Sequence, residues 1–331
     1  MTKNFRLPLI ISLTALFFLN MLMVLSQEPS LVLKQLFSWI IGLVLFAIGT
    51  QIHPKNIKPY RWLLFIFSTI LILSPILLNN ITRGSRRWIN IGGLSIQPSE
   101  IVKPWLLLFL VNTNLPILFF IPVSLILIQP DLGSAVSTAV LALPTIIYNK
   151  KLLTISIIIG IIAIFMSPII WKYGLHDYQR QRITTFINPQ SDPLNKGYNV
   201  IQSQIAIGSG GFWGRGFKKG TQGQLLFLPE KHTDFIFAAM TEEMGFVSVF
   251  ILILSYFLLI NTLIKKAFSS TDKAQLLFTL GIASQIWIQA FINIGMNIGI
   301  LPVTGIPLPF VSVGGSSLMA FLFSLGIIFS S

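Results

Sequence analysis

Hydrophobic residues form long runs along this chain, and short polar segments separate the runs. A helix needs about 20 apolar residues to cross the hydrocarbon core of a membrane. Only residues 112–114 separate the fourth run from the fifth, so these two could instead form a kinked pair or a partly re-entrant hairpin. The runs predict ten membrane-spanning helices, over residues 7–25, 31–50, 60–78, 98–112, 115–129, 132–148, 151–172, 238–264, 274–298 and 314–331.

The composition supports an all-α polytopic membrane protein with a single domain over residues 1–331. Hydrophobic residues make up 53% of the 331 residues and charged residues only 10%, whereas soluble chains carry about 25% charged residues. This excludes an ordinary soluble enzyme, a disordered chain and, despite the net charge of +13, a free nucleic-acid binder. The absence of cysteine excludes disulfides and thiolate chemistry, and the three scattered histidines argue against a histidine-rich metal centre.

The cations of the short loops predict that both chain ends are cytoplasmic, because cytoplasmic loops are enriched in Lys and Arg. No small-residue cleavage site follows the first run, so we interpret that run as an uncleaved span. In this orientation the inner segments contain only one acid, Asp272. Their ten cations are Lys3, Arg6, Lys55, Lys58, Arg61, Lys150, Lys151, Lys265, Lys266 and Lys273.

Three outer segments depart from simple connecting loops. The basic outer loop 79–97 carries three arginines and no acid, which is unusual for a short outer loop. The large extracytoplasmic loop 174–237, between the seventh and eighth helices, has 64 residues, and loops of that length are usually functional. The apolar segment 299–313 contains three prolines, so it should enter the bundle where protein groups satisfy its backbone.

Asp234 is the first candidate for chemistry, because it lies where the large loop ends and an apolar helix begins. Thr233 or Asp234 could be the N-cap of that helix. Alternatively, the carboxylate lies partly desolvated at the membrane boundary, where it could act as a general base. Glu242 and Glu243 follow about 80° and 180° around the helix from Asp234. At least one should be buried, either as a functional group or as a cap or ion-pair partner.

A second group of charged residues lies near the fourth helix. Glu100 and Lys103 share one helix face, and they could neutralise each other or hold a cation at the mouth of a cavity. Asp131 lies between two spans and is predicted to be an N-cap. Arg83 and Arg87 could be solvated, or contact membrane lipids, or add to Lys103 a positive patch that suits the diphosphate of a lipid carrier.

The glycine-dense segment 208–220 lacks the spacing of a nucleotide-binding loop, so it predicts tight turns and close backbone contacts instead.

Taken in series, the motifs of residues 79–331 resemble the SEDS family (shape, elongation, division and sporulation), and its elongation branch more than its division branch. Two departures stand out: Val313 replaces the family's tyrosine, and the connection at 112–114 is shorter than usual. The matching motifs are RWI at 87–89, QPSEIVK at 97–103, QPDLG at 129–133, YQRQRI at 178–183, GYNVIQS at 197–203, AIGSGG at 206–211, GTQ at 220–222, LPEKHTDFIF at 228–237, EEMG at 242–245, LPVTG at 301–305 and LPFVSVGGSS at 308–317.

The resemblance implies ten transmembrane helices in the bacterial cytoplasmic membrane and an inverting glycosyltransferase that polymerises lipid II into peptidoglycan during cell elongation. It maps the family's essential aspartate onto Asp234. It also implies a class B penicillin-binding protein and other elongation proteins as partners. Arg83, Arg87, Glu100, Lys103, Asp131, Glu242 and Glu243 are candidate substrate-binding residues, and no residue cluster identifies a metal site, although a divalent cation could assist.

Two alternatives remain at this stage. A lipid II flippase would use the same cationic cavity without a base, but it should place cations deep in several spans, and apart from Lys103 these spans contain few. A scaffold of the elongation machinery is the other alternative, and it is compatible with enzymatic activity.

Overall fold

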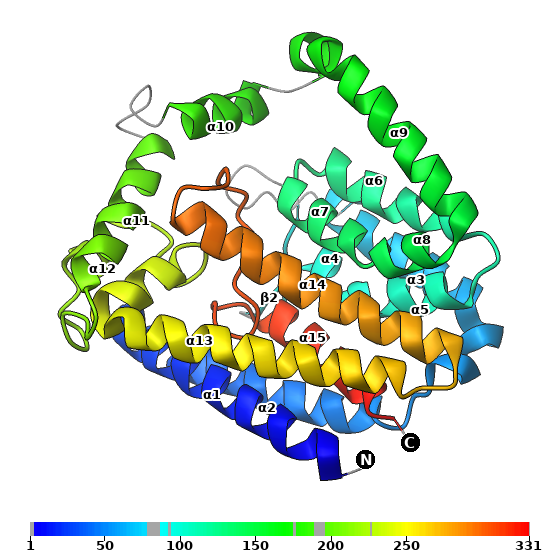
Figure 1. Ribbon diagram of the computed structural model, residues 1–331, viewed down its shortest axis with the longest axis horizontal. Coiled ribbons are helices and arrows are strands. Elements are labelled where there is room, and N and C mark those ends of the chain that lie inside the picture. Colours follow the sequence, from blue (N-terminus) through cyan, green and yellow to red (C-terminus); the bar gives the residue numbers. More distant parts are fainter. Residues whose placement is uncertain are drawn as a thin grey trace.

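The computed structural model describes residues 3–77, 87–91, 94–174, 177–188, 196–225 and 227–330. The chain is helical nearly throughout, and α13 and α14 form a long hairpin across the face shown in Figure 1. The helices, in chain order, are α1 (Lys3–Gln27), η1 (Pro29–Leu31), α2 (Val32–Gly49), η2 (Pro54–Tyr60), α3 (Arg61–Leu77), α4 (Pro98–Ile101), α5 (Lys103–Asn112), η3 (Pro116–Phe119), α6 (Phe120–Ile128), α7 (Leu132–Val140), α8 (Leu143–Tyr148), α9 (Lys150–Ile169), η4 (Ile170–Gly174, a π-helix), α10 (Asp177–Ile187), α11 (Lys196–Gly210), α12 (Thr221–Gln224), α13 (Ile236–Phe268), α14 (Lys273–Asn297) and α15 (Gly315–Ile328).

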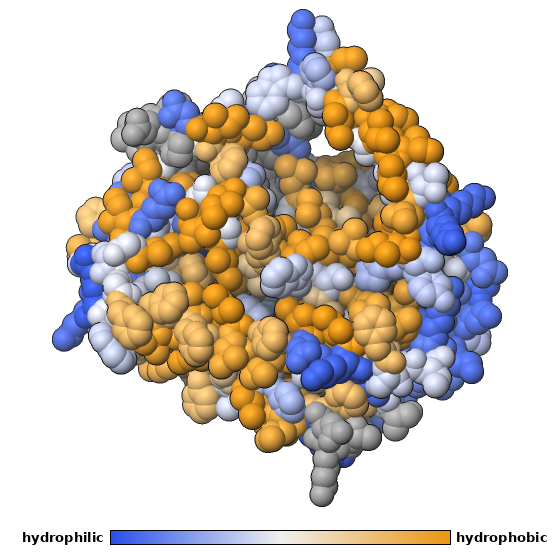
Figure 2. All heavy atoms as spheres, viewed as in Figure 1, coloured by the Kyte–Doolittle hydropathy of each residue, from blue (hydrophilic) through white to orange (hydrophobic). Residues whose placement is uncertain are grey.

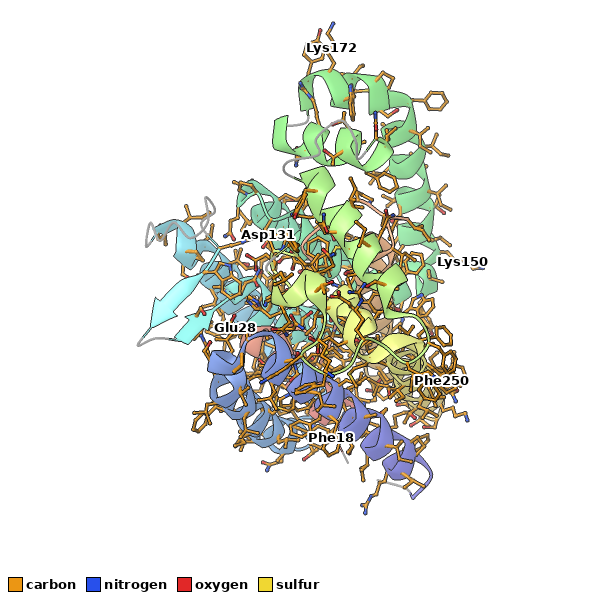
Figure 3. The ribbon with its side chains drawn as sticks, turned by 90° about the vertical axis from the view of Figure 1, so that its left-hand side faces the viewer. Phe18, Glu28, Asp131, Lys150, Lys172 and Phe250 are labelled. Carbon is orange, nitrogen blue, oxygen red and sulfur yellow. The ribbon has the colours of Figure 1, made fainter. Side chains whose placement is uncertain are left out.

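The interior forms where α5 and α15 lie behind the α13–α14 hairpin. The consecutive residues 106–109 of α5 are all completely buried, and most residues of α15 are buried as well. α15 packs tightly on α2, because Gly49 and Gly326 face each other's helix with no side chain between the backbones. By contrast, α9 has no buried residue and projects away from the rest of the molecule, with Lys150 and Lys172 near the two ends of α9 and η4 (Figures 1 and 3).

The outer surface confirms a helical membrane protein. Large apolar side chains such as Phe18 of α1 and Phe250 of α13 are each 58% exposed and point outwards (Figure 3). Hydrophobic residues cover most of the face in Figure 2, while hydrophilic ones gather along its right-hand edge. In the described part of the chain, six helices are long and apolar enough to cross a membrane: Phe5–Gln27, Pro29–Gly49, Pro54–Leu77, Lys150–Ile169, Ile236–Phe268 and Lys273–Asn297.

The other four hydrophobic runs form shorter or interrupted helices. Residues 98–112 divide into α4 and α5, and residues 132–148 divide into α7 and α8. A proline in the first turn follows each break, Pro104 in α5 and Pro144 in α8, where its missing N–H costs no helical hydrogen bond. Residues 115–129 form η3 and α6, and the last run forms α15. Whether all ten runs cross the membrane stays a prediction.

Part of the basic outer loop 79–97 is a β-hairpin. Strands β1 (Ile89–Ile91) and β2 (Leu94–Ile96) pair antiparallel, with Asn90 opposite Ser95. The sequence Ile-Asn-Ile-Gly-Gly-Leu-Ser-Ile alternates apolar and polar residues on both sides of a Gly-Gly pair, which is a typical hairpin pattern. The earlier part of this loop lies outside the described residues.

The glycine-rich segment 208–220 packs against α13 at the point where that helix is broken, and it makes the predicted close backbone contacts. Gly245 has φ 65° and ψ −166°, values that break the helix. The carbonyls of Glu242 and Glu243 accept hydrogen bonds from the N–H groups of Arg215 and Gly216, each at 2.9 Å. In the other direction, the N–H of Phe246 donates to the carbonyl of Gly211 at 3.0 Å. The segment therefore replaces the helical hydrogen bonds that α13 loses at its break.

Replacing Gly245 with alanine should destabilise the protein. A Cβ at this position would overlap the backbone of Gly214 and Phe212, and its positive φ disfavours any side chain; such backbone strain alone costs about 1–3 kcal/mol. We expect Gly245→Ala to lower the Tm of the purified protein in detergent. Gly160→Ala is the matched control, because a Cβ there meets no atom within 4 Å and alanine favours a helix. Equal Tm values for the two variants would contradict this account of the break.

Candidate functional site

Asp234 lies in a turn immediately before α13, and its side chain is half-buried. The N-cap residue of α13 is Phe235, whose own side chain makes no capping hydrogen bond. Of the two alternatives for this position, the N-cap at Thr233 or Asp234 is therefore excluded. The turn curls back on itself, because the N–H groups of Thr233 and Phe235 both donate to the carbonyl of Glu230, at 3.1 and 3.2 Å. This tight turn keeps Asp234 off the axis of α13.

The proline-containing segment 299–313 packs against this turn. The Ser312 hydroxyl donates to the carbonyl of Thr233 at 2.6 Å, and the Val313 N–H donates to the carbonyl of His232 at 2.9 Å. Residue 313 thus contributes a backbone contact that the departure from the family's tyrosine leaves intact. Gly305 has φ 74°, and a Cβ on it would lie 3.4 Å from Asp234 Oδ2. The Asp234 carboxylate therefore lies over the backbone of Gly305.

Protein side chains satisfy the backbone of this segment, as predicted. Asn293 of α14 donates to the carbonyl of Ile306 at 2.9 Å. Tyr256 of α13 donates to the carbonyl of Pro309, and Asn20 of α1 to that of Val311, each at 2.6 Å. A non-helical backbone in an apolar interior needs such partners, and here three helices supply them.

The same segment links Asp234 to the start of α7. A Cβ on Gly133 would lie 2.9 Å from the carbonyl oxygen of Thr304, so α7 approaches this backbone as closely as a glycine allows. Asp131 is the N-cap of α7, as predicted, and it accepts from the Ser134 N–H at 3.1 Å and the Ser134 hydroxyl at 2.8 Å. Residues 304–306 thus lie between Asp234 and the capped end of α7.

Arg87, two residues before β1, contacts this end of α7. Its guanidinium lies 3.6 Å from Asp131 Oδ1, with the arginine side chain 33% exposed and the aspartate 5% exposed. The Gln97 amide donates to Asp131 Oδ2 at 3.1 Å, and the Gln97 N–H donates to the Ser316 hydroxyl at 3.1 Å. Arg87 Nε is buried without a hydrogen-bond partner among the described residues, so the guanidinium keeps an unused donor.

Glu100 and Lys103 form a buried ion pair at 2.6 Å, and both side chains are at most 5% exposed. Lys103 Nζ also donates to the Ser137 hydroxyl of α7 at 2.7 Å, and the Gln289 amide of α14 donates to that same hydroxyl. A buried cation is stable only when it is paired, and Glu100 provides the pairing. Gln285 and Ser317 lie beside the pair.

Glu242 and Glu243 are both fully buried, but they belong to a separate cluster. Glu242 accepts from the N–H groups of Gln222 and Gly223, at 3.0 and 3.3 Å, at the start of α12. Glu243 accepts from the Ser26 hydroxyl at 2.6 Å and from the Gln27 amide at 2.7 Å. These contacts fit the capping alternative for Glu242, and they tie the glycine-rich segment to α1 and α13.

The structure therefore brings together Asp234, Asp131, Arg87 and the Glu100–Lys103 pair. Arg83 lies outside the described residues. The charged groups are held in place by amides and a hydroxyl that were not predicted as site residues. The amides that recur every four residues in the apolar run 274–298 were a usable signal for part of this set. The omitted residues are Gln97, Ser137, Gln289, Asn293 and Asn297. Within the described ranges, no three His, Asp or Glu side chains converge as metal ligands would.

Comparison with known proteins identifies the family of this chain. The model of the FtsW/RodA/SpoVE cell cycle proteins matches residues 1–330. The chain belongs to this family. Peptidoglycan glycosyltransferase MrdB of Escherichia coli K12 is 37% identical over 322 residues, which cover 92% of this chain and 86% of MrdB. A probable peptidoglycan glycosyltransferase FtsW of Trichlorobacter lovleyi is 33% identical and covers 81% of this chain and 75% of that protein.

Solved structures of the FtsW/RodA/SpoVE family share the fold. A chain from a peptidoglycan synthase complex, described as coordinating polymerization and crosslinking, has a TM-score of 0.82 and 29% identity, covering 97% of this chain and 95% of its own. The rod shape determining protein RodA of Thermus thermophilus has a TM-score of 0.69 and 26% identity, covering 97% of this chain and 94% of its own. The predicted resemblance to the elongation branch is confirmed.

Removing the Glu242 carboxylate should loosen the glycine-rich segment. Glu242→Ala leaves the N–H groups of Gln222 and Gly223 without their acceptor, and each unsatisfied buried donor costs about 1–3 kcal/mol. We expect a lower Tm and faster protease cleavage between residues 211 and 225. Glu28→Ala is the control, since Glu28 accepts only at an exposed contact with Ser30. A variant with the parent's Tm and cleavage pattern would instead point to ligand binding by Glu242.

Proposed function

We propose that this protein is a peptidoglycan glycosyltransferase that polymerises lipid II at the outer face of the bacterial cytoplasmic membrane during cell elongation. The observation that carries the proposal is the arrangement around residues 304–306, where a half-buried carboxylate lies on one side and paired cations lie on the other. The names of the relatives agree with it. A carboxylate and nearby cations are the groups that a glycosyl transfer from a diphosphate requires.

In the proposed reaction, the oxygen of an acceptor sugar hydroxyl attacks the anomeric carbon of a lipid-linked donor. The new glycosidic bond forms as the bond from that carbon to the diphosphate oxygen breaks, and the polyprenyl diphosphate leaves with the bonding electrons. Asp234 takes the proton of the attacking hydroxyl. Attack from the side opposite the leaving group inverts the anomeric carbon, so one base suffices, and the diphosphate needs charge stabilisation more than a proton.

The cations have distinct roles in this scheme. The Arg87 side chain is 33% exposed, so its guanidinium can present terminal N–H donors to a phosphate oxygen. Lys103 uses N–H bonds to Glu100 and Ser137, and a further N–H remains for substrate. Asp131 and Glu100 orient these two cations. Arg83 extends the same positive patch in the proposal, while Glu242 and Glu243 act indirectly by shaping the segment before Asp234.

The membrane arrangement belongs to the proposal as well. Ten spans with cytoplasmic N- and C-termini would place the loops 79–97 and 174–237 outside, together with Asp234. The two chain ends lie on the same side of the molecule in Figure 1, which agrees with an even number of spans. The proposed partner is a class B penicillin-binding protein, as the fold's match to a synthase complex of polymerization and crosslinking suggests; other elongation proteins would join the assembly.

Asp234→Asn should abolish glycan-chain formation, because it keeps the size of the side chain and removes the base. The assay uses purified lipid II and the reconstituted protein, with and without its penicillin-binding partner. Asp272→Asn is a matched control, since Asp272 caps the far end of α14 and asparagine caps equally well. Normal polymerisation by Asp234→Asn would contradict the assignment of Asp234 as the base. Failure of the wild type to polymerise, with lipid II still moving across vesicles, would favour a flippase.

Arg87→Gln should weaken substrate binding more than turnover. A hydrogen bond to a charged group is worth about 1.5–3 kcal/mol, so we expect the KM for lipid II to rise about tenfold or more. Arg61→Gln is the control, because Arg61 contacts only its own turn, through the carbonyl of Lys58 at an exposed position. The same KM for both variants would remove Arg87 from the diphosphate site.

A further inference from the structure

The helix α14 carries an amide side chain on one face at every fourth position. Gln285, Gln289, Asn293 and Asn297 are each at most 2% exposed. Residues four apart lie one above the other on a helix, so these amides form a stripe through the interior. Gln285 and Gln289 lie at the Glu100–Lys103 pair. Asn293 and Asn297 lie at Asp234, so the stripe runs from one half of the site to the other.

Asn297 is inserted into the hydrogen-bond ladder at the start of α13. In a continuous helix the N–H of Ala238 would donate to the carbonyl of Asp234. Here the Ala238 N–H donates to Asn297 Oδ1 at 3.3 Å, while Asn297 Nδ2 donates to the Asp234 carbonyl at 3.0 Å. One side-chain amide thus takes the place of one helical hydrogen bond and holds its two ends apart.

Asn293 reinforces this arrangement. Its Nδ2 donates to the same Asp234 carbonyl at 3.0 Å and also to the carbonyl of Ile306 at 2.9 Å. Ile306 follows Gly305, whose backbone faces the Asp234 carboxylate. The Asp234 carbonyl therefore accepts two amide donors, and one of these donors also fixes the segment that the carboxylate faces.

We propose that Asn297 is a positioning residue for Asp234, and that Asn293 supports it. The inserted amide prevents α13 from extending back to Asp234. Such an extension would rotate the carboxylate away from Gly305 and from the acceptor hydroxyl. This inference rests on the proposed function of Asp234 as the base. The role requires a donor and an acceptor at a fixed reach, which asparagine provides and an aliphatic side chain does not.

Asn297→Asp tests the role of the donor. Ionised aspartate still accepts from Ala238 but offers no hydrogen to the Asp234 carbonyl. We expect kcat to fall about 10- to 100-fold, the size of effect that a misplaced catalytic group produces, with the KM for lipid II within about twofold of wild type. A protonated carboxyl regains a donor, so the ratio of variant to wild-type kcat should increase as the pH is lowered. Gln275→Glu, which also introduces a carboxyl at a buried position of α14, should show no such recovery of kcat.

Asn297→Ala provides a second test of the positioning role if Asn297→Asp does not fold. It leaves the Asn293 donor on the Asp234 carbonyl, so it should lower kcat while KM stays close to wild type, without recovery at low pH.

Gln275→Glu is the matched control. Gln275 is also a buried amide of α14 that donates to a backbone carbonyl, that of Ile328 at 2.7 Å, but at the opposite end of the helix. It should lower Tm without changing the kcat of the folded protein.

The outcomes separate this inference from the proposed function. Loss of kcat in both Asn297 variants, pH-dependent recovery in Asn297→Asp and an unchanged kcat in Gln275→Glu support the positioning role. Wild-type kcat in a folded Asn297→Asp or Asn297→Ala, while Asp234→Asn is inactive, overturns the positioning role alone. Full activity of Asp234→Asn overturns the proposed function and the positioning role together. An equal loss of kcat in Gln275→Glu also overturns the positioning role, because the effect would then be general.

Discussion

The backbone polar groups in the interior of this protein need hydrogen-bond partners from the protein itself, because lipid offers none. This constraint explains why the α14 amides matter so much. The Asp234 carbonyl, left without a helical partner at the start of α13, is satisfied by Asn293 and Asn297. The Ile306 carbonyl, in a segment that cannot be helical, is satisfied by Asn293 as well. The same hydrogen bonds that make an irregular backbone tolerable also determine where the Asp234 carboxylate lies.

The same constraint explains the second buried cluster. The break at Gly245 leaves carbonyls and N–H groups of α13 without helical partners, and the glycine-rich segment supplies both kinds of group from its own backbone. Glu242 and Glu243 then accept from the remaining donors of α12 and α1. Two carboxylates close to Asp234 in sequence thus hold the segment that leads to it, whereas Asp234 itself lies beside Gly305. A buried acid in a membrane helix indicates function, and in our proposal these two acids act by shaping the segment before Asp234.

The sequence predicted the larger features because they depend on a single repeated property. Long apolar runs indicated the helices, and the Asp131 cap and the Glu100–Lys103 pair followed from local spacing. The hairpin at 89–96 was also present as a local pattern, and its Gly-Gly pair was a missed signal. The insertion of Asn297 between Asp234 and Ala238 was not predictable, because it joins residues that are 59 and 63 positions apart in the chain. For the same reason, the local sequence could not decide between the N-cap alternative and the other alternative at Asp234: a distant amide, that of Asn297, accepts from the first turn of α13 instead.

Burial also explains why the cations of the site are paired with acids. Lys103 and Arg87 are each paired with an acid before any substrate arrives, which keeps a buried positive charge stable. Pairing also fixes their direction, so that unused N–H groups remain at defined positions. In the proposed function, a diphosphate would add to these pairs without breaking them, and its charge would meet donors that need little reorganisation. The proposed site therefore combines a carboxylate on one side of residues 304–306 with pre-oriented cations on the other, and the amides of α14 contact both halves.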